Sequence, residues 1–162
     1  MLIQRGAKRY CQVLFEPAFA AHHAVWLTAE GSDDARVHVS VLAEAARHSF
    51  EAPLDRRTAT LLKRLCHSFL TPPPPMCARI GPDGVWYHAA HFVGARGYAM
   101  RSFWSPKAGT TDEKLVRVAE ALRDYAVAPE QLRSVYWLSI QRTASSLECA
   151  LHPGHVGCSA AR

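Results

Sequence analysis

Residues 85–104 constrain the fold of this chain more than any other segment. Two aromatic-rich runs, VWYHAAHFV (85–93) and YAMRSFW (98–104), lie on either side of the short glycine-bounded loop GARG. Two strand-like runs joined by so short a loop favour a β-hairpin, in which the strands pair antiparallel. Together the runs carry more aromatic rings than a sheet with a single buried face needs.

The predicted hairpin places aromatic rings on both of its faces. With a four-residue loop, the facing pairs would be Val93 with Tyr98, His91 with Met100, and His88 with Phe103. One face would then carry Tyr87, His91, Val93, Tyr98, Met100 and Trp104, and the other Trp86, His88, Phe92, Arg101 and Phe103. Core packing under helices accounts for one such face but not for both. Because Trp, Tyr, Met and Arg are enriched at interfaces, we predict a partner-binding surface formed by Trp86, Tyr87, Tyr98, Met100, Arg101 and Trp104.

Hydrophobic patterning predicts the other elements of the chain. Apolar runs bounded by turn residues indicate further strands at 9–15, 24–30, 35–43 and 135–142, the last pairing with residues around 147–151. In 35–43, valines alternate with other residues, so the valine side is expected to be buried. Apolar residues spaced by three and four predict amphipathic helices at about 54–70 and 111–126.

The order of these elements favours an α+β fold. Strands come first, then a helix, the aromatic hairpin, a second helix and a final strand. This order suits an antiparallel sheet of about six to eight strands with two helices packed on one face. Four consecutive prolines at 72–75 indicate a stiff connector before the hairpin. We expect a single domain, 1–162, with a loosely held C-terminal tail at 152–162.

The positive charge of the chain is spread along its length. The net charge is +5, with 15 Arg and 4 Lys, and no run of five basic residues occurs. Proteins that bind nucleic acids usually gather their charge in a patch or stripe. The distribution therefore argues against a nucleic-acid partner.

Cysteine usage predicts a reducing compartment. The five cysteines are odd in number and irregularly spaced, unlike a secreted disulfide framework. Cys66 falls on the apolar side of the first predicted helix, as a small core residue would. The N-terminus imitates a signal peptide, but Gln12, Glu16 and Pro17 interrupt its apolar stretch. No run approaches 18 apolar residues, so we expect no membrane segment and a cytoplasmic location.

The C-terminal segment CALHPGHVGC carries four potential zinc ligands, Cys149, His152, His155 and Cys158. Their identity and number suit a tetrahedral zinc site. Their spacing does not, since familiar zinc modules separate two ligand pairs by a dozen or more residues. We therefore expect no cofactor, and a zinc-binding or metal-dependent role for this segment stays an alternative.

Recognised catalytic motifs are missing from the sequence, which contains no GxSxG, no HExxH and no Gly-rich phosphate loop. His88 and His91 form an HxxH pair. On a strand, residues three apart face opposite sides, so these two histidines cannot share one ion. The chain is expected to be non-catalytic, although a triad assembled in space stays open.

Three segments together carry a resemblance: DGVWYHAAHF, GYAMRSFWSP and TTDEKLVRVAEALRDYA. They resemble small cytosolic bacterial proteins in which a DG-aromatic strand, an aromatic strand ending in WSP and a closing helix occur together. Several of these resemble immunity proteins, which neutralise contact-delivered or type VI secreted toxins. The resemblance covers about residues 81–126. Immunity families carry no catalytic residues, so no functional residue is carried over.

The resemblance implies a protein that binds a cognate toxin domain, encoded by a neighbouring gene, and blocks its active site. The net charge of +5 would suit an acidic partner surface, which makes a nuclease a less natural target. A secretion chaperone or adaptor is the alternative. It would hold an unfolded or amphipathic segment of its partner on an exposed sheet.

Overall fold

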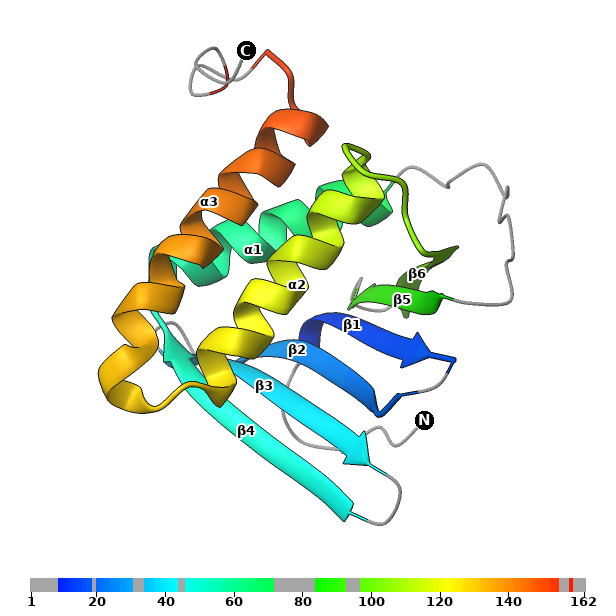
Figure 1. Cartoon of the computed structure of the whole chain (residues 1–162). Helices are drawn as coiled ribbons and strands as arrows, with labels where there is room; N and C mark the ends of the chain where they lie inside the picture. Colours follow the sequence, from blue (N-terminus) through cyan, green and yellow to red (C-terminus); the bar gives the residue numbers. More distant parts are fainter. Residues whose placement is uncertain are drawn as a thin grey trace.

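The computed structural model describes residues 9–18, 20–30, 34–43, 46–71, 84–92, 97–154 and 158. In this part of the chain, six strands form one antiparallel sheet, and three α-helices pack on one side of it (Figure 1). The predicted α+β class is therefore confirmed.

The sheet has the strand order β4-β3-β2-β1-β5-β6. Its strands are β1 (Arg9–Pro17), β2 (His22–Glu30), β3 (Asp34–Ala43), β4 (Ala46–Leu54), β5 (Val85–Phe92) and β6 (Tyr98–Trp104). The edge strand β4 was not predicted, because its sequence ARHSFEAPL contains few alternating apolar residues and a proline. An edge position tolerates both features, since one side of the strand needs no ladder partner.

Both predicted helices are present, and each begins after a capping residue. α1 (Arg56–Leu70) starts after Asp55, whose carboxylate accepts hydrogen bonds from the backbone N–H groups of Arg57 and Thr58. α2 (Thr111–Val127) starts after Thr110, whose hydroxyl accepts from the N–H of Glu113. Each cap satisfies backbone donors that the first helical turn leaves unpaired.

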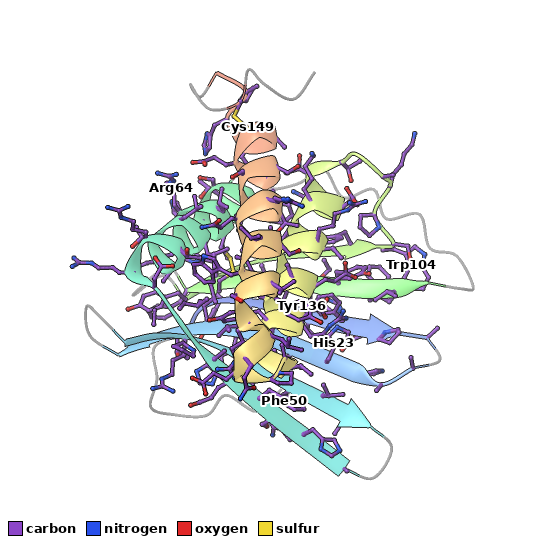
Figure 2. All side chains as sticks on the ribbon, turned by 60° about the vertical axis from the view of Figure 1, so that its left-hand side comes forward. His23, Phe50, Arg64, Trp104, Tyr136 and Cys149 are labelled. Carbon is purple, nitrogen blue, oxygen red and sulfur yellow. A yellow bond between two sulfur atoms is a disulfide. The ribbon has the colours of Figure 1, made fainter. Side chains whose placement is uncertain are left out.

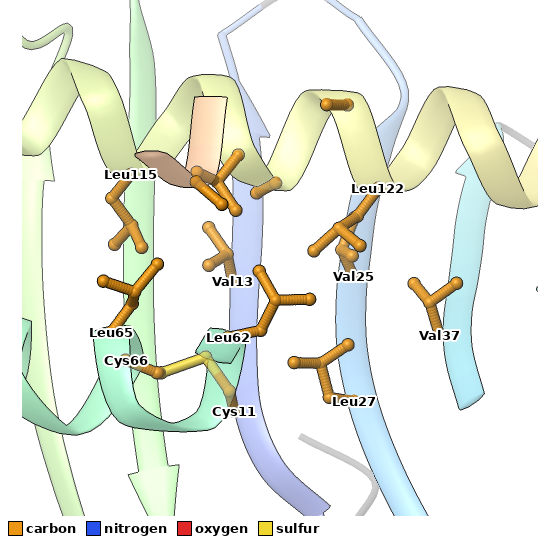
Figure 3. Packing of buried hydrophobic residues seen from close by; sticks show 14 of the residues in the cluster. Cys11, Val13, Val25, Leu27, Val37, Leu62, Leu65, Cys66, Leu115 and Leu122 are labelled. Carbon is orange, nitrogen blue, oxygen red and sulfur yellow. A yellow bond between two sulfur atoms is a disulfide. The ribbon is translucent and has the colours of Figure 1, made fainter. Parts of the chain in front are cut away.

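The core lies between the helices and one face of the sheet (Figure 3). Val13, Val25 and Val37 point from their strands toward the helices, where Leu62 of α1 and Leu122 of α2 belong to the same cluster. The valine side of β3 is buried, as its alternation predicted, with Val37 and Val39 fully inaccessible. In the central parts of β1 and β3, every second residue is buried in this core.

Residues 135–142, predicted to be a strand, are helical. A 3-10 turn, η2 (Glu130–Leu132), leads directly into α3 (Arg133–Leu151), which packs against α2 and α1. The prediction was wrong because the run VYWLSI places apolar side chains all round the helix, which hides the 3.6-residue period. The expected pairing partner, 147–151, is the last part of the same helix.

The aromatic hairpin is present, but its register differs from the prediction by one residue. The pairs are Phe92 with Tyr98, His91 with Ala99, and His88 with Ser102. Five residues, not four, separate the strands, and Val93 lies outside the described residues. Since side chains alternate between faces, this single-residue shift changes which side chains of the two strands share a face.

Two disulfides join residues that the spacing of cysteines did not suggest. Cys11 of β1 bonds Cys66 of α1 within the core (Figure 3), and Cys149 bonds Cys158 beyond the end of α3. Cys66 is buried, as its position on the apolar side of the helix predicted. None of the described helices is long and apolar enough to cross a membrane.

Candidate protein-binding surface

The sheet has a second side, opposite the helices, which we call the open face. Directly paired residues of antiparallel strands point to the same side, so the strand registers define it. No described helix lies over this side (Figure 1). On β5 and β6 it carries a group of six residues that we call the hairpin patch: Trp86, His88, Phe92, Tyr98, Met100 and Trp104.

The hairpin patch combines exposed side chains with rings that hold one another in place. Met100 is 57% exposed and Tyr98 is 44% exposed, while Trp86, Phe92 and Trp104 are partly exposed. Phe92 and Tyr98 pack edge to face with centroids 5.4 Å apart, and Trp86 and Trp104 do so at 5.3 Å. Rings that are already ordered lose little conformational entropy when a partner covers them.

Gly84, the glycine of the DG-aromatic motif, packs closely against the Trp104 indole. A Cβ atom at this position would lie 2.5 Å from Cζ2 of Trp104 and 2.4 Å from Oγ of Ser105. The Ser105 hydroxyl in turn accepts a hydrogen bond from the backbone N–H of Val85 at 3.0 Å. Only a residue without a side chain allows this close approach, which gives the DG-aromatic motif a packing reason.

A chain of polar groups crosses the patch at His88. Its Nδ1 lies 2.8 Å from the hydroxyl of Ser102 on β6, and its Nε2 lies 3.1 Å from a carboxylate oxygen of Glu16 on β1. The His88 ring also stacks near Trp86, with centroids 6.1 Å apart and planes 16° from parallel. Three neighbouring strands therefore fix the orientation of this imidazole.

Ser102, His88 and Glu16 are the group types of a nucleophilic triad. Acyl transfer also needs donors for the oxyanion that develops in the transition state. β5 pairs with β1 on one side and β6 on the other, so the N–H groups around His88 are committed to the ladder. The three side chains form a polar anchor within the aromatic surface.

Two of the six predicted partner-binding residues face the helices instead. Tyr87 is 9% exposed and stacks on Phe103 with centroids 5.6 Å apart. The Arg101 guanidinium lies 4.6 Å from the centre of the Phe69 ring and 2.6 Å from a carboxylate oxygen of Asp112. The Arg101 contacts tie the hairpin to α1 and α2, and both side chains lie on the helix side of the sheet, not on the open face.

The structure brings the other four predicted residues, Trp86, Tyr98, Met100 and Trp104, onto one face. It adds His88 and Phe92, which the sequence analysis assigned to the opposite face of Tyr98. The length of the loop between β5 and β6 was the only local signal that could have assigned His88 and Phe92 to the same face as Tyr98. A five-residue loop in place of a four-residue loop reverses the side on which β6 places its aromatic residues relative to β5.

Toward the other edge of the sheet, the open face becomes polar. Arg36 on β3 pairs with Glu51 on β4 at 2.7 Å, and Nε of Arg47 donates to the Ser40 hydroxyl at 2.9 Å. Leu42 is 59% exposed beside them. The open face therefore has an aromatic end on β5–β6 and a mixed polar end on β3–β4.

Several titratable side chains with shifted pKa values lie on the helix side of the sheet. Burial lowers the pKa of His23, and the nearby Arg123 guanidinium lowers it further. Burial raises the pKa of Glu120, which lines an open hollow of about 580 Å³ together with Tyr87, Ser139 and Thr143. Burial and then the charge of Glu120 raise the pKa of Tyr87.

The proposed zinc ligands of the C-terminal segment are not arranged around an ion. Cys149 and Cys158 are bonded to each other, and a disulfide sulfur is not the thiolate that zinc requires. His152 is exposed at the end of α3, and His155 lies outside the described residues. Within the described ranges, no group of three or more His, Cys, Asp or Glu residues could hold a metal ion.

Comparison with known proteins adds no family assignment. No protein-family model matches the chain, and no curated protein matches it at a significant level. The functional argument therefore depends on the surface itself.

Proposed function

We propose that this protein is a non-catalytic binding module whose hairpin patch docks on a folded protein partner. The observation that carries the proposal is the gathering of Trp86, Tyr98, Met100 and Trp104 on a side of the sheet that no described helix covers. Large aromatic side chains with a polar anchor at their centre are typical of the residues that dominate binding energy at interfaces.

Within this class, an immunity protein that blocks a cognate bacterial toxin is the best match. The resemblance of residues 81–126 to such proteins supports it. The net charge of +5 favours a partner with an acidic surface, since opposite charges speed encounter. The partner would be a toxin domain encoded by a neighbouring gene, and the complex would form in the cytoplasm.

Coexpression with the product of the adjacent gene tests this proposal. The tagged protein should retain the toxin through purification and should rescue the growth of cells that express it. A variant with Met100→Glu should do neither, while Val127→Glu, an exposed residue on the helix side, should behave like the wild type. Failure of the wild-type protein both to bind and to rescue would contradict the proposal.

A secretion chaperone or adaptor is a second candidate, because the same sheet face could hold an extended or amphipathic segment. The activity of the bound partner separates the two functions. An immunity protein abolishes the activity of its toxin in the complex. A chaperone leaves a folded partner domain active, because it holds a segment outside that domain.

Zinc binding by the C-terminal segment is a third candidate, and it depends on the redox state of Cys149 and Cys158. If the segment binds zinc, protein purified with reductant should contain about one equivalent, and oxidised protein should contain none. Less than about a tenth of an equivalent in the reduced protein would end this candidate.

The cytoplasmic location can be tested on the same cysteines. Cytosolic thiol pools keep most protein cysteines reduced. Because both cysteines are buried in the folded protein, cells should be quenched with acid and the protein unfolded in the presence of an alkylating reagent. Labelling of Cys11 and Cys66 as free thiols would support the cytoplasm, and absence of labelling at both would place the protein in an oxidising compartment.

A further inference from the structure

The outer edge of β4 is an open strand edge. Within the described part of the chain, β4 pairs with β3 on one side and with no strand on the other (Figure 1). In Figure 2, Phe50 marks this strand at the lower end of the molecule, away from Trp104 on β6. Residues 46–51 are all exposed. Such an edge presents a row of backbone donors and acceptors with which a further strand can pair.

Pro53 identifies the backbone groups of β4 that point outward. It lies within the β3–β4 ladder but has no N–H to donate, so its nitrogen faces away from β3. Because the direction of backbone groups alternates along an antiparallel strand, the N–H and C=O groups of Arg47, Ser49 and Glu51 also face away. The Glu51 carbonyl fits this orientation, since it accepts a hydrogen bond from Nη2 of Arg133 at 3.4 Å.

The free part of the edge ends at Glu51. Pro53, the next outward-facing residue, has no donor, and its carbonyl already accepts a hydrogen bond from the Tyr125 hydroxyl at 2.8 Å. The outward-facing residues that remain are Arg47, Ser49 and Glu51. Ser49 is therefore the centre of the stretch that can accept another strand.

The charges on this stretch are arranged symmetrically about Ser49. Arg47 precedes it by two residues and Glu51 follows it by two, and both side chains lie on the open face. Charged residues on an edge strand ordinarily prevent pairing between copies of a protein. Two opposite charges at equal distances from one centre have the reverse effect, because antiparallel pairing would place each against the other.

Both charged side chains have capacity for a further contact. Nε of Arg47 donates to the Ser40 hydroxyl at 2.9 Å, and Arg47 has no ion pair among the described residues. Oε1 of Glu51 lies 2.7 Å from Nη1 of Arg36, and Oε2 lies 3.4 Å from Nδ1 of His38. The Arg47 guanidinium would therefore gain an ion pair across the edge without giving one up.

We propose that β4 pairs antiparallel with β4 of a second copy of this chain, about a two-fold axis at Ser49. Ser49 then faces Ser49 of the partner subunit, and Arg47 faces Glu51 of the partner subunit. The two residues of each such pair exchange both of their backbone hydrogen bonds. The contact is self-complementary, as a two-fold axis requires. The Glu51 carbonyl has a second lone pair, so it can accept from the partner while the Arg133 contact stays in place.

This interface is independent of the proposed function. The hairpin patch lies on β5 and β6, at the other end of the sheet, so pairing of β4 leaves the patch of each copy free. A dimer without toxin binding, or toxin binding without a dimer, would therefore affect only one of the two proposals. The contact is one strand wide, and small interfaces are usually weak, so we expect a reversible dimer.

Sedimentation velocity of the full chain at concentrations up to about 1 mM tests the dimer. The weight-average mass should rise from the monomer value of 17.9 kDa toward twice that value. Ser49→Pro should stay monomeric, because it removes the donor at the centre of the edge. Its fold should survive, since the lost N–H faces away from β3, as the Pro53 nitrogen does. A wild-type protein that stays monomeric over the whole range overturns the proposal.

Mixing two charge variants tests the register. Arg47→Glu and Glu51→Arg should each dimerise about tenfold more weakly than the wild type, because each homodimer faces like charges at both ends of the pairing. In an equimolar mixture, the heterodimer has opposite charges at both ends, so dimerisation should return. Arg142→Glu makes the same charge change as Arg47→Glu at an exposed position on α3 and should dimerise like the wild type.

Two outcomes of the mixing experiment would overturn the register. One is single variants that dimerise like the wild type, and the other is a mixture that dimerises no better than its components. Arg47 and Glu51 are both exposed, and circular dichroism of each variant before mixing checks that the fold is kept. A rescue cannot arise from altered folding, because the same two proteins are measured alone and together.

Discussion

Trp86 and Trp104 pack edge to face across β5 and β6, with ring centroids 5.3 Å apart, on the side of the sheet opposite the helices. The backbone of Gly84 packs against the Trp104 indole so closely that no side chain would fit between them. The surface that we propose for partner binding thus depends on Gly84, the residue that precedes β5.

Replacing Gly84 with alanine should displace Trp104 and weaken partner binding. The added Cβ would lie 2.5 Å from the indole, so the ring must move. Tryptophan fluorescence should shift, and the affinity for the proposed partner should fall. Gly154→Ala is the matched control, since a Cβ there meets nothing within 4 Å. Unchanged fluorescence in the Gly84 variant would contradict the packing role of this glycine.

Truncating Trp104 to alanine should lower partner affinity by about 30-fold or more, the effect of a typical interface hot spot. Leu42→Ala, at the polar end of the same open face, should change the affinity far less. Both affinities can be measured by titration calorimetry with the partner that coexpression identifies. Equal effects of the two substitutions would mean that the partner does not centre on the hairpin patch.

Replacing Arg101 with alanine should destabilise the protein by about 2 kcal/mol without altering the open face. The substitution removes the ion pair with Asp112 and leaves that partly buried carboxylate without its charged partner. Denaturant unfolding measures the loss. Arg47→Ala removes an arginine at the exposed β4 edge and should cost much less. If Arg101→Ala weakens partner binding more than its loss of stability explains, Arg101 belongs to the binding surface after all.

Removing the Cys11–Cys66 disulfide should lower stability under oxidising conditions by about 4 kcal/mol, because the bond closes a long loop in the unfolded chain. The two cysteines are 55 residues apart in sequence. Unfolding of the Cys11→Ala variant, compared with the wild type with and without reductant, measures the effect. Cys149→Ala opens a loop between cysteines only 9 residues apart and should have a smaller effect. If reductant does not change wild-type stability, the bond does not contribute.

Stability should decrease as the pH falls below about 6.5, the ordinary pKa of histidine. Burial lowers the pKa of both His23 and His91 in the folded protein, so the unfolded chain binds protons more readily. The raised pKa of Glu120 acts in the opposite direction, stabilising the fold at low pH and losing that effect as the pH rises. Unfolding of wild type and His23→Gln at several pH values checks the sign. The variant should show a shallower slope.

The spacing of apolar residues correctly predicted the helices and strands that bury a single face. The helix at 54–70 and the strand at 35–43 each bury one face, so their apolar residues recur with the period of a helix or of a strand. The helix α3 was not predicted, because its apolar residues serve both an inner and an outer side. The edge strand β4 was not predicted, because most of its side chains are exposed and carry little pattern.

The sequence by itself determined that residues 85–104 form a strand pair rich in aromatic side chains. Only the tertiary structure decided that Trp86, Trp104 and Met100 share one side, while Tyr87 and Arg101 turn toward the helices. The reason is that side chains on a strand alternate with a period of two, so one residue more or less in the loop reverses the faces of β6 relative to those of β5. The register is held by packing of Tyr87 and Phe103 against β1 and α1, contacts between residues far apart in the chain.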